Sequence, residues 1–231
     1  MPAPLCIFCE GPSEVRYLNA WNALLRDTDV PLVLVPKPMN GGVLVHVREV
    51  LNAFFRENKR AHCLVWADSD LYHRNDGGCA DTLREIYTGL PDFEFSVHNF
   101  EDFVAAHLDD ASFARWQEVF ADHLAMPLHS RDYNPLYQQV LRGYSKGVLP
   151  VPHTIISYDA LVRVKKRLPL LQPPNIPDGM PQYPLFAKRF IAEIENAASL
   201  LIEDLAAAWP PLPIDILPKR RKRGRRPVLH A

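Results

Sequence analysis

Residues 5–14 read Leu5-Cys6-Ile7-Phe8-Cys9-Glu10-Gly11-Pro12-Ser13-Glu14, an apolar run that ends in an acidic turn and a helix start. Five consecutive apolar residues bounded by a Gly-Pro turn are typical of a buried β-strand. Helical periodicity follows from Ser13 to about Arg26, and Ser13 is the candidate N-cap. A buried strand joined by a short turn to a helix is the first unit of an α/β fold.

Further apolar runs repeat this arrangement over the first hundred residues. We expect strands at Pro31–Val35, Ala61–Trp66 and Phe93–Val97. One predicted helix follows the loop Asn40-Gly41-Gly42 and runs from Val43 to Phe54. A second, shorter helix is predicted at Thr82–Leu90. Strands that alternate with helices predict a mostly parallel sheet flanked by helices.

After residue 100 the strand signal fades and helical periodicity takes over. Glu101–Ala125, Pro135–Arg142 and Leu185–Ala208 each predict a helix, whereas the six prolines of Leu168–Pro184 predict a loop or an extended strap. The C-terminal half is therefore expected to be helical. We divide the chain into an α/β core (1–110), a helical extension packed on that core (111–208), and a proline-rich, then basic tail that we expect to be disordered (209–231).

The composition indicates one main globular fold. The chain has 231 residues, of which 48% are hydrophobic and 23% charged, which suits one sizeable core with an appended helical part. It contains no run of about eighteen apolar residues, the length that a membrane span needs. Residues 1–11 lack the basic start of a secretory signal. We therefore expect a cytoplasmic protein with no membrane contact.

Cys6 and Cys9 have the C-x-x-C spacing that redox pairs and zinc knuckles share. Within a strand, however, residues three apart point to opposite faces of the sheet. We interpret both as small buried residues in a reducing compartment, with redox or zinc chemistry as the alternative.

Charge is distributed unevenly along the chain. Residues 219–226 of the tail hold seven basic side chains and no acid follows Asp215, so the residues upstream of Lys219 carry 19 basic against 27 acidic side chains. The body thus has a net charge of about −8 and the tail about +7. We expect the tail to attract nucleic acid through phosphate contacts. The alternatives are a solubilising tail, or an arm that binds the acidic body or a partner. The seven residues are Lys219, Arg220, Arg221, Lys222, Arg223, Arg225 and Arg226.

Acidic residues follow the first and third predicted strands. Glu10 closes the first strand, and Asp68 and Asp70 close the third with a spacing that places both on one face. The carboxyl ends of neighbouring parallel strands open into one crevice, so these side chains are expected to converge. Carboxylates in such a group suit Mg²⁺ or Mn²⁺, and phosphodiester chemistry is the reaction that such a site favours.

Four elements in order resemble the RloB-like family of Toprim-fold proteins, which are found beside bacterial restriction and phage-defence genes. Cys9-Glu10-Gly11-Pro12-Ser13-Glu14 with Tyr17-Leu18 resembles the family's C-E-G-x-[TS]-E-x-x-[YF] opening, and Trp66-Ala67-Asp68-Ser69-Asp70 stands where the family has D-x-D. Asn99-Phe100-Glu101-Asp102-Phe103 with His107-Leu108 is similar to F-E-x-W-x-x-x-H-[FL], with Phe103 in place of the usual Trp. Tyr144-Ser145-Lys146-Gly147 is similar to the Y-x-K stretch before the final helix.

The resemblance implies a Toprim-like sheet and a Mg²⁺- or Mn²⁺-dependent nuclease that cleaves DNA or RNA in defence against phage. It implies catalytic roles for Glu10, Asp68 and Asp70, and metal ligation by these three and Glu14. Glu101, His107 and Lys146 are then expected near the substrate or behind the metal ligands.

Two other classes of function stay open. A non-catalytic adaptor or sensor could keep the fold and bind an ATPase partner, while the chain itself has no G-x-x-x-x-G-K-[ST] loop for ATP hydrolysis. A glycosyltransferase also uses D-x-D with Mn²⁺, although it would not require Glu10. The sequence also leaves open whether the protein forms a homo-oligomer.

Overall fold

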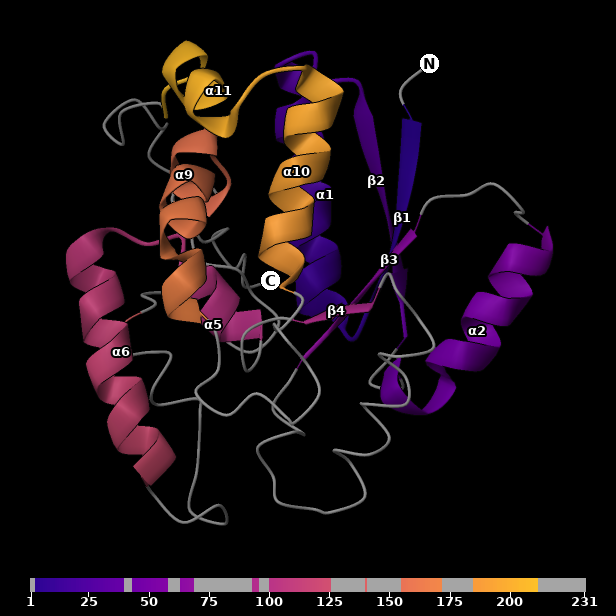
Figure 1. Cartoon of the computed structure of the whole chain (residues 1–231), viewed down its shortest axis with the longest axis horizontal. Helices are drawn as coiled ribbons and strands as arrows, with labels where there is room; N and C mark the ends of the chain where they lie inside the picture. The colour runs from indigo at the N-terminus through magenta and orange to yellow at the C-terminus, as the bar shows by residue number, and fades with distance from the viewer. Residues whose placement is uncertain are drawn as a thin grey trace, which may run out of the picture.

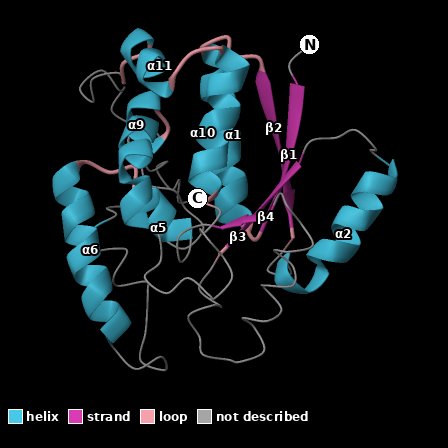
Figure 2. Ribbon diagram, in the orientation of Figure 1, coloured by secondary structure: helices cyan, strands magenta, loops and turns pink. Residues whose placement is uncertain are grey.

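The computed structural model describes residues 3–39, 43–57, 63–68, 93–95, 100–125, 140, 155–171 and 185–211. It contains a parallel sheet with strand order β2-β1-β3-β4 (Figures 1 and 2). The strands are β1 (Ala3–Cys9), β2 (Leu32–Pro38), β3 (Cys63–Ala67) and β4 (Phe93–Phe95). The expected α/β architecture with a parallel sheet is confirmed.

Strand β1 lies inside the sheet, between β2 and β3. It pairs with β2 from Ala3 to Cys9 and with β3 from Cys6 to Cys9. The side chains of β3 are all buried, as expected for a strand covered on both faces. Since β1 and β3 are parallel, the residues that follow them, Glu10 and Asp68, emerge at the same edge of the sheet.

Helices cover both faces of the sheet. Helix α2 (Val43–Glu57) lies on one side, whereas α1 (Pro12–Asp27) and α10 (Phe186–Ala198) lie on the other (Figure 1). On the α2 side, the rings of Phe8 and Phe54 are 5.3 Å apart. On the α1 side, Trp66 stacks on Phe186 of α10 with ring centres 3.8 Å apart. The C-terminal half of the chain therefore packs directly on the sheet.

The other described helices are α5 (Phe100–Ala105), α6 (Asp110–Ala125), α9 (Tyr158–Arg167) with a short 3₁₀ turn at Leu168–Leu171, and α11 (Ile202–Ala208). Of these, α5 also contacts the sheet, through Phe100 and Phe103 against Trp66, whereas α6 and α9 lie farther from it (Figure 1). Helix α9 joins the end of α1, because Thr28 Oγ1 and Tyr158 Oη lie 2.6 Å apart. The described C-terminal half is mainly helical, as predicted. No helix in the described part of the chain has both the length and the apolar character of a membrane span.

Two long helices predicted from periodicity are each divided in the structure. The stretch Glu101–Ala125 breaks at residues 106–109, where the Asp109 carboxylate accepts hydrogen bonds from the backbone N–H and hydroxyl of Ser112 and starts α6 as a new helix. The stretch Leu185–Ala208 breaks at Ser199, whose φ of 55° is left-handed and ends α10. Both stretches are helical, as their periodicity predicts, but in each a cap divides the helix in two.

The start of α1 also differs from the prediction. Gly11, not Ser13, is the N-cap residue, and Pro12 takes the first helical position. Proline is favoured there because its fixed φ suits a helix and its missing N–H has no intrahelical partner to lose. The Gly-Pro pair therefore sets the helix start two residues earlier than a serine cap would.

Helix α9 was not predicted from the sequence. The Ser157 hydroxyl caps it by accepting a hydrogen bond from Ala160 N, and the buried residues Tyr158, Leu161 and Val164 form its apolar stripe. Part of the predicted strap, Leu168–Leu171, is a 3₁₀ turn. The rest of the strap, the predicted helix Thr82–Leu90 and all of Pro135–Arg142 except Val140 lie outside the described residues.

The outer side of β2 is held by α1. Asn22 of α1 forms two hydrogen bonds with Leu34: its Oδ1 accepts from the backbone N–H at 2.8 Å, and its Nδ2 donates to the carbonyl at 2.7 Å. Leu32 N–H donates to Val30 O at 2.8 Å. The next two residues that face the same way, Pro36 and Pro38, have no N–H.

Candidate functional site

Glu10 and Asp68 meet at the carboxyl edge of the sheet. Both are half-buried, and the backbone N–H of Asp68 donates a hydrogen bond to Glu10 Oε2 at 3.3 Å. This contact joins the residue after β1 to the residue after β3, although 58 positions separate them in sequence. The strand pairing and this hydrogen bond thus bring the backbone of Asp68 to the carboxylate of Glu10.

Glu14 lies beside them on the first turn of α1. Its side chain is only 5% exposed. It occupies the third helical position and accepts a hydrogen bond from the backbone N–H of Gly11, the N-cap residue. This is the return half of a capping box, in which the carboxylate satisfies a donor at the helix start. Glu14 therefore supports α1 as well as facing the acidic edge.

The carboxylates of this edge repel one another. Burial, followed by the charges of Glu10 and Glu101, raises the pKa of Glu14 from 4.5 to about 7, against the lowering effect of backbone hydrogen bonds. Glu101 is half-buried on the first turn of α5. The effect of its charge on Glu14 shows that α5 contributes to the same electrostatic environment as β1 and α1.

The raised pKa of Glu14 predicts a pH-dependent stability. Between pH 4.5 and about 7 the folded protein holds a proton that the unfolded chain has released, so the free energy of unfolding falls as pH rises through this range. We compare the free energy of unfolding of Glu14→Gln with that of the natural protein at each pH. The effect of the substitution is expected to be more stabilising at pH 8 than at pH 4, by up to about 3 kcal/mol. Urea unfolding of both proteins at the two pH values measures the difference. An equal effect at both pH values would contradict a raised pKa.

The carboxylate residues at this edge suit Mg²⁺ better than a metal ion whose ligands all come from protein side chains. Within the described residues, no three His, Cys, Asp or Glu side chains are arranged as a ready metal site. Mg²⁺ commonly uses one or two carboxylates and keeps several waters, and Glu10 and Asp68 are two carboxylate residues that a backbone hydrogen bond joins at this edge. The predicted third ligand Asp70, the predicted basic residue Lys146 and the basic tail lie outside the described residues.

His107 lies deep in the protein. It is 0% exposed, and burial lowers the pKa of its imidazole to about 3, so the ring is neutral. Its Nδ1 lies 2.8 Å from the Phe103 carbonyl and its Nε2 lies 2.9 Å from Tyr17 Oη. The ring therefore joins α1 to the end of α5.

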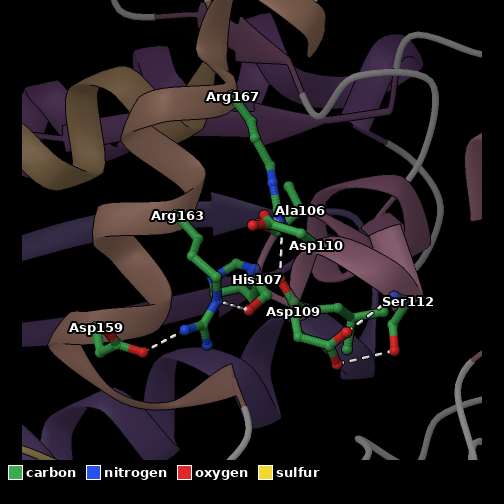
Figure 3. Close-up of polar contacts among 9 residues, drawn as sticks. Ala106, His107, Asp109, Asp110, Ser112, Asp159, Arg163 and Arg167 are labelled. Atoms are coloured by element: carbon green, nitrogen blue, oxygen red, sulfur yellow. Dashed lines mark hydrogen bonds and ion pairs between the residues drawn. The ribbon is translucent and has the colours of Figure 1, made fainter. Parts of the chain in front are cut away.

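Two arginines that the sequence analysis did not select hold the turn between α5 and α6. Arg163 Nε donates to the His107 carbonyl at 2.8 Å, and Arg167 Nη1 donates to Ala106 O at 2.8 Å and Leu108 O at 2.6 Å (Figure 3). Arg163 also pairs with Asp159 one turn earlier on α9. Their i,i+4 spacing places the two arginines on one face of α9, but it does not indicate which turn they contact.

A hollow of about 540 Å³ lies beside these arginines, between α6 and α9. Its lining includes Asp110, Phe113 and Lys166. Arg167 Nη2 lies 2.5 Å from Asp110 Oδ1, and its guanidinium lies 4.2 Å above the ring of Phe113. The polar groups of Arg167 are thus used within the protein, which supports a structural role for this face.

We compared the chain with known proteins at the levels of sequence family, curated protein and solved structure. No family model, curated protein or solved structure matches it. The function has to be inferred from the acidic edge itself.

Proposed function

We propose that this protein is a Mg²⁺-dependent nuclease that hydrolyses phosphodiester bonds of DNA or RNA. The observation that carries the proposal is the hydrogen bond between Asp68 N and Glu10 Oε2, which brings two acids from neighbouring parallel strands together at the carboxyl edge. This edge is where open α/β sheets bind their ligands. The resemblance to RloB-like Toprim proteins is part of the same proposal.

Each acidic residue has a distinct proposed role. Glu10 and Asp68 bind the metal ion, with Asp70 and Glu14 as the further ligands. Bound Mg²⁺ supplies polarisation of the scissile phosphate and a more acidic water. Glu10 also moves a proton during cleavage.

The remaining parts of the proposal concern the substrate and the cellular role. The seven basic residues of the tail balance the acidic body and attract the nucleic acid backbone. Lys146 contacts a phosphate. We place the protein in the cytoplasm, in defence against phage or other foreign nucleic acid.

Cleavage of labelled plasmid DNA and total tRNA by the purified full chain tests the activity. We expect cutting of at least one substrate with Mg²⁺ or Mn²⁺, none after chelation with EDTA, and weaker activity at high salt because binding depends on phosphate contacts. Folding is checked in parallel by circular dichroism. A folded protein that cuts neither substrate with either metal contradicts the proposal.

That negative outcome would favour the adaptor. The capping role of Glu14 and the internal hydrogen bonds of His107 are compatible with a protein that keeps this architecture without catalysis. Its helical half would then bind an ATPase partner. Substitution of Asp68 separates the two functions, because an adaptor does not need that carboxylate.

A further inference from the structure

Helices α1 and α5 each bring a carboxylate to the acidic edge, and a buried hydrogen bond links α1 to the turn that follows α5. Glu14 and Tyr17 are three residues apart on α1 and therefore share one side of the helix. Glu101 lies on α5, and His107 follows the end of that helix. The Tyr17 hydroxyl and His107 Nε2 are 2.9 Å apart.

The direction of this hydrogen bond follows from its neighbours. The Phe103 carbonyl, 2.8 Å from His107 Nδ1, can only accept, so Nδ1 carries the hydrogen. In a neutral imidazole the other nitrogen is then an acceptor. Tyr17 must therefore donate its hydroxyl hydrogen to His107 Nε2. Tyr17 is thus the donor and His107 the acceptor, and the bond holds both rings in one orientation.

The α5 end of this contact is itself fixed from the opposite side. The carbonyl of His107 accepts from Arg163, and the carbonyls of Ala106 and Leu108 accept from Arg167 (Figure 3). Both arginines belong to α9. The turn that carries His107 is thus held between α9 and Tyr17 of α1.

The ring of Tyr17 packs well without its hydroxyl. It makes edge contacts with Trp66, Phe100 and Phe103 at centroid distances of 5.8, 6.1 and 5.2 Å. These contacts would survive replacement by phenylalanine. What the hydroxyl adds is a directional link between α1 and α5.

We infer that Tyr17 is a positioning residue, whose hydrogen bond to His107 sets the spacing between Glu14 and Glu101 and thereby the affinity of the acidic edge for a divalent cation. This inference rests on the proposed function. It predicts that Tyr17→Phe weakens the binding of Mn²⁺ about 10-fold, the scale at which residues behind metal ligands act.

The test is titration of the full chain with Mn²⁺ by calorimetry and electron paramagnetic resonance, well below the unfolding temperature. Tyr158→Phe is the matched control: its hydroxyl also makes a buried hydrogen bond, 2.6 Å from Thr28 Oγ1, but at the far end of α1. We expect Tyr158→Phe to keep the affinity of the natural protein. His107→Asn is a second variant, because asparagine retains a donor for the Phe103 carbonyl but does not reach Tyr17, and the same 10-fold loss is expected.

The outcomes separate the two proposals. If the natural protein binds no Mn²⁺, both the proposed function and the role of Tyr17 are overturned. If it binds Mn²⁺ and Tyr17→Phe binds equally well, only the positioning role is overturned. Equal weakening by Tyr17→Phe and Tyr158→Phe would also overturn it, because general loosening of α1 would then account for the loss.

Discussion

Replacing Asp68 by asparagine is expected to reduce metal-dependent cleavage about 1,000-fold, a loss of about 4 kcal/mol in transition-state stabilisation. Asparagine has nearly the same shape but no charge, so the fold is retained while the attraction for Mg²⁺ falls. Glu10→Gln is expected to have an effect of similar size, because Glu10 meets Asp68 at the sheet edge. Initial rates with saturating Mg²⁺ on the substrate that the natural protein cuts measure both effects.

Asp122→Asn is the matched control for this series. Asp122 is exposed on α6, away from the carboxyl edge, and its change removes the same charge from the surface of the protein. It should cleave like the natural protein within about two-fold, since an isolated surface charge has little effect. Retained cleavage in Asp68→Asn would remove the acidic edge from the proposed mechanism.

Replacing Arg167 by alanine is expected to destabilise the protein by about 3 kcal/mol. The ion pair with Asp110 contributes little, because the Asp110 side chain is 99% exposed. The larger part comes from the two carbonyls, Ala106 O and Leu108 O, which lose their donor, and from the contact with Phe113. Equilibrium urea unfolding measures this cost.

Arg115→Ala is the control for this prediction, because it measures how much an exposed arginine on α6 contributes to the free energy of unfolding. Arg115 pairs with Glu118 at 3.3 Å, but both side chains are more than half exposed. We expect a change in unfolding free energy below about 0.5 kcal/mol. If the two arginine variants were equally stable, the turn between α5 and α6 would not depend on α9.

The strands and the acidic edge were predictable because their signals are local. Each described strand overlaps a predicted strand, and the parallel order of β1, β2 and β3 follows from the helices α1 and α2 between them. Glu10 and Asp68 could be paired in advance because strand ends in a parallel sheet share an edge. The boundaries were less accurate: β2 extends to Pro38, since a sheet edge accepts prolines that sequence patterns count as breakers.

The contacts that hold the site were not predictable in the same way. Arg163 and Arg167 have the sequence character of surface residues, and only tertiary packing shows that Arg167 is buried against carbonyls of a distant turn. His107 was selected by its place in a motif, but its hydrogen bond to Tyr17 spans 90 positions. Pairings over such distances depend on how the helices pack and leave no periodic trace in the sequence.

The outer side of β2 limits how this protein can associate with other chains. A sheet usually grows when an incoming strand forms a ladder with exposed N–H and C=O groups at its edge. Here Asn22 occupies both groups of Leu34, Leu32 N–H is already bonded, and the two prolines offer no hydrogen. An incoming strand would find carbonyl acceptors but no donor, and half of its ladder would be missing. Growth of the sheet through β2 is therefore closed, both to a second copy of the chain and to aggregation by edge-to-edge pairing.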